Sequence, residues 1–166
     1  MLTFKPISYA ENRGFTFQPV WFDFNNDNLM DLYISQDFGT GQLYKNKGDG
    51  TFKNVTRSMG LNIYGTGMGV SVTDFNQDGF WDLLVSTGGA NQLWVNQRGN
   101  GFKNKVEHFK MGDQNRFGWG VAPIDVENSM DQAYFVINGV TAKGSDLNHY
   151  QKIMMEVNNQ DKFFVK

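Results

Sequence analysis

The residues of this chain that are best suited to chemistry are oxygen-bearing side chains in a short acidic loop. Asp or Asn stands at the first, third, fifth and ninth positions of the segment Asp74–Asp82. Side chains two residues apart can point inward together in a tight turn, and Gly79 at the sixth position allows that turn. Ca²⁺ prefers such hard oxygen ligands, at about 2.3–2.6 Å, whereas Zn²⁺ prefers nitrogen and sulfur. We therefore predict a calcium site whose ligands are Asp74, Asn76, Asp78, the Phe80 backbone carbonyl and Asp82.

A second acidic loop lies 51 residues earlier in the chain and has the same pattern. Asn28 replaces the glycine, and Asn is the residue that next best tolerates a left-handed backbone. Neither loop is an EF-hand, because the twelfth position is Ile34 or Val85 rather than a bidentate Glu. A plain hairpin turn rich in Asp and Asn is the alternative interpretation. The repeated pattern favours a second calcium site, with ligands from Asp23, Asn25, Asp27, the Leu29 backbone carbonyl and Asp31.

A third copy, which begins at Asp125, has lost much of the pattern. Asp125 and Glu127 keep their carboxylates, but Ser129 and Ala133 replace two others. Asp131 has a carboxylate at a position where the other loops would use a backbone carbonyl. We predict that this third loop holds no calcium.

The loops belong to a repeat of about 51 residues that is built from short strand-like pieces. Val70 and Val72 alternate with other residues, which indicates a half-buried strand, and Leu83–Val85 has the apolar run of a strand buried on both faces. Gly, Asn and Asp separate the pieces, and no stretch has a sustained helical period. In the second unit we predict strands over Gly69–Phe75, Asp82–Thr87, Gln92–Asn96 and Phe102–Val106. Four strands in a repeat of this length are typical of a β-propeller blade.

We therefore predict an all-β fold with three four-stranded antiparallel blades that form part of a larger β-propeller. The blades would cover residues 14–60, 61–113 and 114–166, with an inserted loop near 139–150 in the last of them. Residues 1–13 contain Phe4–Ser8, which is similar to Phe52–Thr56 and is predicted to be the last strand of a preceding blade. Three blades are fewer than the roughly four to eight that close a ring. A second copy, a partner chain or further repeats of a parent protein would complete it, and an open wedge with capped end faces is the alternative.

The four tryptophans are predicted to be buried in the blades. Trp21, Trp81, Trp94 and Trp119 each lie in or beside a predicted strand, where an aromatic side chain commonly packs into the core. An aromatic platform for ligand binding is the alternative interpretation.

Composition excludes several classes of protein. The chain has 166 residues, of which 40% are hydrophobic, no Cys and a formal net charge of −2. This content excludes general disorder, disulfides and thiolate metal sites. The absence of a Lys/Arg cluster argues against nucleic-acid binding, and no apolar run approaches the ~20 residues of a membrane-spanning helix. No signal peptide is visible, so we expect any export signal to have been removed or to lie outside this chain.

The sequence contains few residues in patterns that would indicate catalysis. The two histidines, His108 and His149, lie outside nucleophile and metal motifs such as G-x-S-x-G and H-E-x-x-H. A lone His is more often a surface or core residue than a catalytic one. We therefore expect no enzymatic activity.

The repeat resembles the FG-GAP/VCBS family, whose blades form the β-propellers of integrin α-subunits and of many bacterial surface and secreted proteins. Residues Phe117–Pro123 are similar to the motif that names the family, and the two acidic loops are similar to its D-x-[DN]-x-D-G-x-x-D loop. The segment Gln92–Asn96, followed by Gly101 and Phe102, resembles the ASPIC/UnbV-type variant. The resemblance covers nearly the whole chain, and it departs from the family pattern at Asn28 and in the third loop.

The resemblance implies propellers that calcium stabilises and that serve in adhesion or ligand binding. It favours a module for protein or glycan contact, located outside the cell, at its surface or in the periplasm, in which calcium is structural. An architectural subunit of a larger assembly and an accessory propeller of a polysaccharide lyase-like enzyme are the alternatives, because such a fold does not imply one activity.

Overall fold

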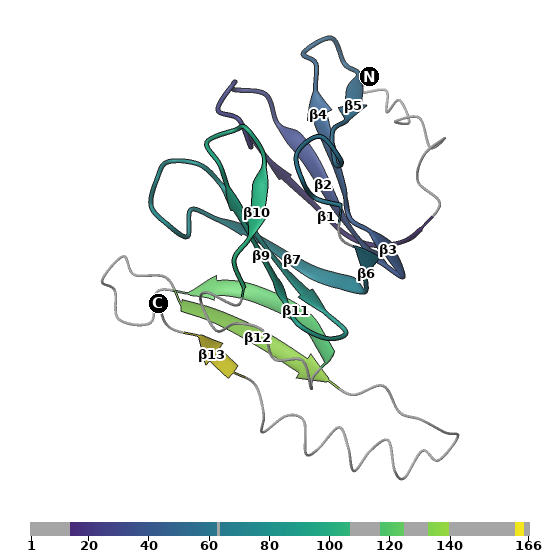
Figure 1. The fold of residues 1–166 in the computed structure, drawn as a ribbon, viewed down its shortest axis with the longest axis vertical. Coiled ribbons are helices and arrows are strands. Elements are labelled where there is room, and N and C mark those ends of the chain that lie inside the picture. Colours follow the sequence, from purple (N-terminus) through teal and green to yellow (C-terminus); the bar gives the residue numbers. More distant parts are fainter. Residues whose placement is uncertain (1–13, 63, 107–116, 125–132, 140–161, 165–166) are drawn as a thin grey trace, which may run out of the picture.

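The computed structural model describes residues 14–62, 64–106, 117–124, 133–139 and 162–164, and in these residues every regular element is a β-strand. The first sheet has the order β1 (Phe15–Phe22), β2 (Asp31–Asp37), β4 (Gln42–Asn46) and β5 (Phe52–Asn54). The second has the order β7 (Gly67–Thr73), β8 (Asp82–Thr87), β9 (Gln92–Asn96) and β10 (Phe102–Asn104). The third contains β11 (Phe117–Ile124), β12 (Ala133–Gly139) and β13 (Lys162–Phe164), and β3 (Gly39–Thr40) pairs with β6 (Tyr64–Gly65). All these pairings are antiparallel (Figure 1).

The second unit has the four strands that its sequence pattern predicts. The predicted bounds of Asp82–Thr87 and Gln92–Asn96 are confirmed, whereas the first strand begins and ends two residues earlier and the last ends at Asn104. Leu83, Leu84 and Val85 are buried, as expected of a strand that is covered on both faces. The prediction of an all-β fold with antiparallel sheets is confirmed, but the structure does not show a propeller, and the third sheet has three strands within the described residues.

The 51-residue repeat of the sequence is accompanied by a recurring irregularity of the backbone. The first strand of each large sheet has a register shift against its neighbour, and these shifts begin at Thr16, Gly67 and Gly118, which are 51 residues apart. A bulge bends a strand and increases its local twist. The three first strands therefore deviate from a flat sheet at the same point of each unit.

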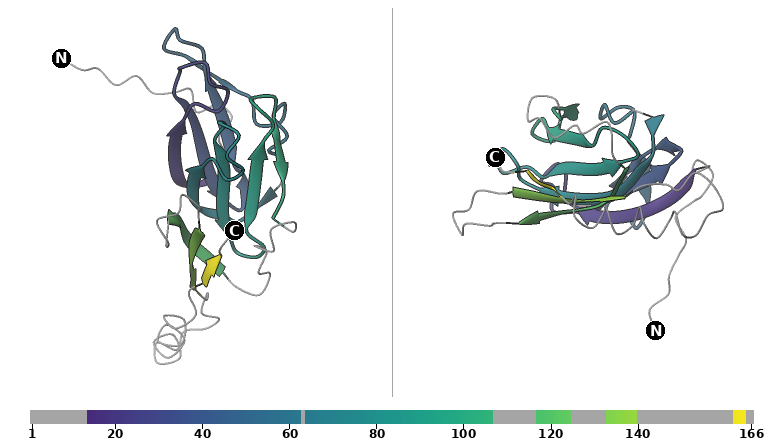
Figure 2. Two further views of the ribbon diagram at one scale, coloured as in Figure 1. Left: turned by 90° about the vertical axis from the view of Figure 1, so that its left-hand side faces the viewer. Right: turned by 90° about the horizontal axis from the view of Figure 1, so that it is seen from below.

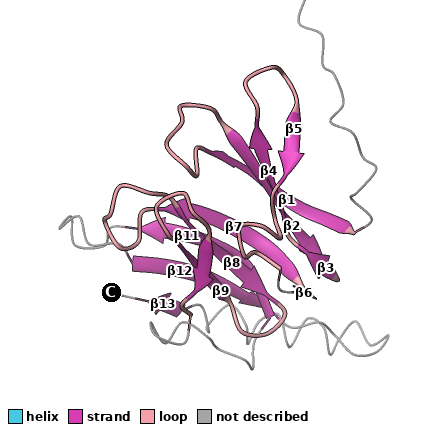
Figure 3. Cartoon of the chain, turned by 45° about the horizontal axis from the view of Figure 1, so that its top comes forward, coloured by secondary structure: helices cyan, strands magenta, loops and turns pink. Residues whose placement is uncertain are grey.

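The second sheet lies between the other two, so that the sheets follow one another in sequence order (Figures 1 and 3). Phe22, Tyr33 and Leu43 of the first sheet form one hydrophobic cluster with Leu83, Val85 and Trp94 of the second. On the opposite face, Phe75, Leu84 and Leu93 form another cluster with Tyr134 of the third sheet. Figure 2 shows the sheets from two further sides. Burial on both faces of β8 thus comes from a sheet on either side.

Glycine allows the first strands of neighbouring sheets to approach closely. A Cβ atom at Gly69 in β7 would lie 2.7 Å from the Cα atom of Gly120 in β11 and 3.0 Å from the carbonyl oxygen of Trp119. Backbone occupies that space, so a larger residue would have to push the two strands apart. Within the Phe117–Pro123 segment, Gly118 is tightly packed in a similar way, because a Cβ atom there would lie 2.9 Å from the Cβ atom of Ser86.

The prediction that all four tryptophans are core residues is wrong for three of them. Trp94 is only 3% exposed, but Trp21, Trp81 and Trp119 are 49%, 44% and 40% exposed. Trp21 lies on the face of the first sheet that the second sheet does not cover, and its ring contacts Phe52 of the same sheet. Trp81 lies in the second acidic loop, and Trp119 is the bulged residue of β11. A strand position decides burial only where another sheet covers that face.

Three predictions fall on residues outside those that the structure describes. They concern the closing strand within residues 1–13, the third acidic loop from Asp125 to Gln132, and the inserted loop beyond Gly139.

Candidate metal centre

The first acidic loop connects β1 to β2 and folds around its own carboxylates. The Asp23 carboxylate accepts hydrogen bonds from the backbone N–H groups of Asn25 at 3.3 Å, Asp27 at 3.1 Å and Asn28 at 2.7 Å. The Asp27 carboxylate accepts from the Leu29 backbone N–H at 3.0 Å and from the Asn25 side-chain amide at 3.0 Å. These contacts bring the first seven residues of the predicted site into a single tight turn.

The second acidic loop, between β7 and β8, has nearly the same contacts. The Asp74 carboxylate accepts from the backbone N–H groups of Asp78 at 2.9 Å and Gly79 at 2.7 Å. The Asp78 carboxylate accepts from the Phe80 backbone N–H at 3.0 Å. Asn76, the remaining side-chain ligand predicted for this turn, is exposed. Equivalent residues therefore make equivalent bonds in two loops of different sequence.

The ninth residue of each loop, Asp31 or Asp82, is fully buried at the start of a strand. Asp31 accepts from the backbone N–H groups of Phe24 at 3.2 Å and Asn46 at 2.8 Å. Asp82 accepts from those of Phe75 at 2.9 Å and Asn96 at 2.7 Å. Each of these carboxylates thus ties its loop to the end of the third long strand of its sheet.

Burial and neighbouring carboxylates raise the pKa of both ninth residues. Burial is the larger cause, and it raises the pKa of Asp82 to about 6, with repulsion from Asp78 and Asp74 adding to the increase. The pKa of Asp31 is raised by burial first and also by Asp27 and Asp23. The charged form of each group is therefore disfavoured by its surroundings. A bound cation would relieve both effects.

Left-handed backbone occurs at the same two positions of each loop. The φ angles are 56° at Asn26 and 64° at Asn28 in the first loop, and 58° at Gln77 and 86° at Gly79 in the second. The expectation that Asn28 takes the conformation of the missing glycine is confirmed. Asn adopts this region more readily than most residues, which explains why the first loop keeps its turn without glycine.

The donor set fits calcium chemically. All predicted ligands are oxygens, and the Oδ1 atom of Asn25 is buried without a hydrogen-bond partner. A buried acceptor without a donor is costly, and a cation would satisfy it. Among the described residues, no three or more His, Cys, Asp or Glu side chains converge as a metal-binding group, and the loop carboxylates bind backbone N–H groups instead.

A basic side chain lies beside the fifth residue of each loop. The Lys45 ammonium is 3.1 Å from the Asp27 carboxylate, and the Arg98 guanidinium is 3.9 Å from that of Asp78. Together with Asn25, Lys45 lowers the pKa of Asp27 against the opposing effect of burial, which is the largest single contribution. The basic side chain is therefore closer to the loop carboxylate in the first loop than in the second.

The two loops contact each other at one end of the stacked sheets. The Asn26 side-chain amide donates to the Gly79 carbonyl at 3.0 Å. The buried Asn96 side chain donates to the carbonyls of Phe24 at 2.8 Å and Trp81 at 3.0 Å, and so joins both loops. Sequence reasoning missed this role, although the recurrence of Asn46 as Asn96 at the end of a matching strand was a signal.

The model of one protein family, described as an FG-GAP-like repeat, matches residues 23–85. The match starts at the first residue of the first acidic loop and ends within β8, so it includes both loops. This chain contains an FG-GAP-like repeat. The predicted resemblance is thereby confirmed for the segment that carries the candidate metal ligands.

The chain is also distantly homologous to cartilage acidic protein 1. It is 28% identical over 151 residues to the protein from Xenopus tropicalis, which covers 87% of this chain and 22% of that protein. It is 28% identical to the human protein and 27% identical to the mouse protein over 95 residues, which cover 56% of this chain and 14% of each relative. The chain thus spans less than a quarter of the length of these relatives.

Within the part of the chain that the structure describes, no helix is long and apolar enough to cross a membrane.

Proposed function

We propose that this chain is a calcium-binding FG-GAP/VCBS-type propeller module that makes contact with proteins or glycans outside the cytoplasm and has no enzymatic activity. The observation that carries the proposal is the pair of acidic loops with equivalent hydrogen bonds and equivalent left-handed residues. FG-GAP-like repeats often bind calcium, and both loops lie within the matched segment. Calcium is structural in this proposal.

Calcium would be held in the first loop by Asp23, Asn25, Asp27, the Leu29 carbonyl and Asp31. In the second loop it would be held by Asp74, Asn76, Asp78, the Phe80 carbonyl and Asp82. Its contribution would be positive charge among carboxylates that otherwise repel one another. The chain itself fixes the ninth residue through two backbone N–H groups, one from the loop and one from the strand beyond it.

Removal of one ligand tests the assignment of sites. We expect Asp78→Ala to destabilise the calcium-loaded protein more than Asp125→Ala does, because Asp78 is a charged ligand of a complete loop whereas the Asp125 loop lacks two carboxylates. Thermal unfolding of both variants in excess calcium measures the difference. Equal losses of stability would show that the third loop also binds calcium or that the second does not.

The outer face of the first sheet supports contact with a further blade. Cross-strand pairs place Trp21 beside Leu32 and Pro19 beside Ile34, on the face that points away from the second sheet. The equivalent residues of the second sheet include Val70, Leu83 and Val85, which the first sheet covers. Since the same positions form a buried interface one repeat later, we propose that this face packs against a further repeat, from a second copy or a partner chain.

Light scattering on the purified chain tests ring completion. We expect a mass above 18.9 kDa that falls with dilution, because an exposed apolar sheet face favours association. Trp21→Glu should reduce association, and the matched variant Trp81→Glu, in a loop outside this face, should not. A concentration-independent mass near 18.9 kDa would favour an open wedge instead.

Two other functions make different predictions. A purely architectural subunit would bind no member of a glycan array, whereas a contact module of the glycan-binding kind would. An accessory propeller with lyase-like activity would degrade acidic polysaccharides in a direct assay.

A further inference from the structure

A polar pocket of about 400 Å³ lies at the edge of the first sheet, away from both acidic loops. Its volume is in the usual range for a small-molecule site. It is formed where the β5 strand ends and the chain turns toward β6, so that residues from β3, β4, β5 and the turn all reach it. Its lining contains no acidic side chain and consists of Thr40, Gln42, Asn54, Thr56, Arg57 and Asn62.

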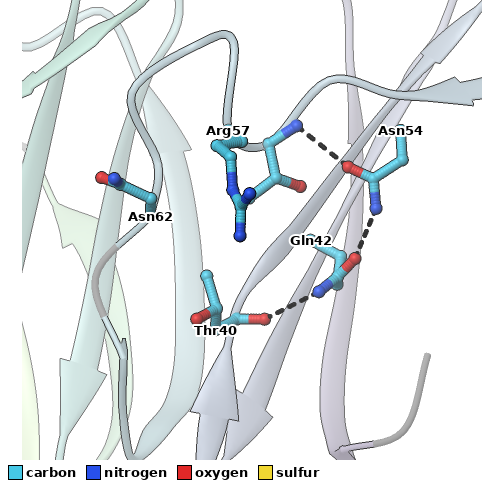
Figure 4. A pocket seen from close by; sticks show the side chains of 6 residues that line it. Thr40, Gln42, Asn54, Arg57 and Asn62 are labelled. Atoms are coloured by element: carbon cyan, nitrogen blue, oxygen red, sulfur yellow. Dashed lines mark hydrogen bonds between the residues drawn. The ribbon is translucent and has the colours of Figure 1, made fainter. Parts of the chain in front are cut away.

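A chain of hydrogen bonds fixes the wall of this pocket. The Gln42 amide donates to the Thr40 carbonyl at 3.2 Å, and the Asn54 amide donates to the Gln42 side-chain oxygen. The Asn54 side-chain oxygen accepts from the Thr56 backbone N–H at 3.0 Å, and the Thr56 hydroxyl accepts from the Leu43 N–H at 2.8 Å. Most of these hydrogen bonds are drawn in Figure 4. The wall is therefore ordered before any ligand arrives.

Arg57 is the only charged residue of the lining, and its guanidinium extends into the space between the turn and the Thr40–Gln42 segment (Figure 4). Within the described residues Arg57 has no ion pair or side-chain hydrogen bond. Its backbone is nevertheless well placed, because the turn is anchored on either side by buried Val55 and Leu61, which bond to the carbonyls of Leu43 and Thr56. The pocket thus presents an exposed guanidinium on an anchored turn, and its donors are available to a ligand.

Comparison of the first two repeat units distinguishes residues with a structural role from residues without one. Gln42 and Asn54 recur fifty residues later as Gln92 and Asn104, which indicates a structural role for this amide pair. Arg57 does not recur, and Glu107 stands at the equivalent position of the second unit. A guanidinium is therefore not required for a unit of this kind to fold.

An aromatic residue outside the lining is the cross-strand neighbour of Thr40, which lines the pocket. Thr40 pairs with Tyr64 across the β3–β6 sheet, so both side chains lie on the same face, and Tyr64 is 71% exposed. An exposed ring beside amide, hydroxyl and guanidinium groups suits a sugar, which has one apolar face and many hydroxyls. The guanidinium fork suits a carboxylate, which it can bind through two parallel hydrogen bonds.

We propose that this pocket binds an acidic sugar of the hexuronate class, with its carboxylate on Arg57 and its ring beside Tyr64. This assignment rests on the proposed role in glycan contact and names the class of glycan. It is independent of the two calcium loops, since none of their residues lines the pocket.

The test is a nuclear magnetic resonance titration of the full chain in calcium buffer with three probes: a methyl hexuronide, the matched neutral methyl hexoside and inorganic sulfate. We expect the hexuronide to shift the Arg57 side-chain N–H and the Tyr64 ring signals, and to bind about tenfold or more tightly than the neutral hexoside, as expected for a charge-assisted contact. Equal affinity for the neutral sugar, no shift with the hexuronide, or equal shifts with sulfate alone would each overturn the proposal.

Variants separate this pocket from the calcium loops. Arg57→Gln should weaken hexuronide binding about tenfold or more. Lys53→Gln removes the same charge from an exposed residue of β5 that does not line the pocket, and it should leave binding unchanged. Unchanged binding in Arg57→Gln would overturn the proposal. Calcium titration of the same variants distinguishes a defect in the pocket from a defect in the calcium loops. If Arg57→Gln loses hexuronide binding but still binds calcium, only the pocket is affected.

Discussion

Replacement of Trp94 by Ala is expected to cost roughly 3–5 kcal/mol of unfolding free energy. Trp94 is 3% exposed and packs in the cluster between the first and second sheets with Leu83, Val85 and Phe22. Its indole N–H donates to the Gln92 side-chain oxygen at 3.0 Å, so the substitution removes a bond as well as leaving a cavity. Urea denaturation of both proteins in excess calcium measures the loss.

Trp21→Ala is the matched control for this substitution. The Trp21 side chain is 49% exposed and lies on the outer face of the first sheet, so its removal from a single chain should cost far less. The two variants should be compared at low protein concentration, where association through that face is weakest. A Trp94→Ala protein as stable as Trp21→Ala would mean that the two sheets do not pack as described.

Removal of calcium is expected to lower the melting temperature. A ligand that binds only the folded state adds about 2.7 kcal/mol to stability at a hundredfold excess over Kd, and two independent sites would add about 5 kcal/mol. The buried Asp31 and Asp82, whose pKa values are raised, are the groups whose charge the cation would offset. Calorimetry in EDTA and then in excess calcium measures the shift.

Magnesium serves as the control for this experiment. Mg²⁺ demands near-octahedral geometry and gives up its water reluctantly, so it should restore less stability than calcium at the same concentration. An unchanged melting temperature on chelation would contradict calcium-linked folding, and full restoration by magnesium would contradict a site built for calcium.

Local pattern was sufficient to predict the parts of the fold that depend on local chemistry. The apolar run of β8 predicted a strand buried on both faces, and the Asp spacing predicted tight turns with a left-handed residue at Asn28. In both cases the cause lies within a few neighbouring residues. The 51-residue repeat of the sequence also has a counterpart in the fold, because the bulge in the first strand of each sheet recurs at the same interval.

Features that depend on distant parts of the chain were not predictable in this way. The burial of Trp94 and the exposure of Trp21 differ because a neighbouring sheet covers one and not the other. The bridge from Asn96 to the Phe24 carbonyl joins residues 72 positions apart. The pocket around Arg57 likewise arises where a turn meets β3, β4 and β5, and no spacing in the sequence marks it.

The central claim, that both acidic loops bind calcium, is tested most directly by the stoichiometry of calcium binding. Isothermal titration calorimetry of the chelator-stripped chain should give two calcium ions per chain. Asp27→Ala and Asp78→Ala should each reduce this number to one, because each removes a ligand from a different loop. A stoichiometry of zero for the folded, unmodified chain would contradict the account.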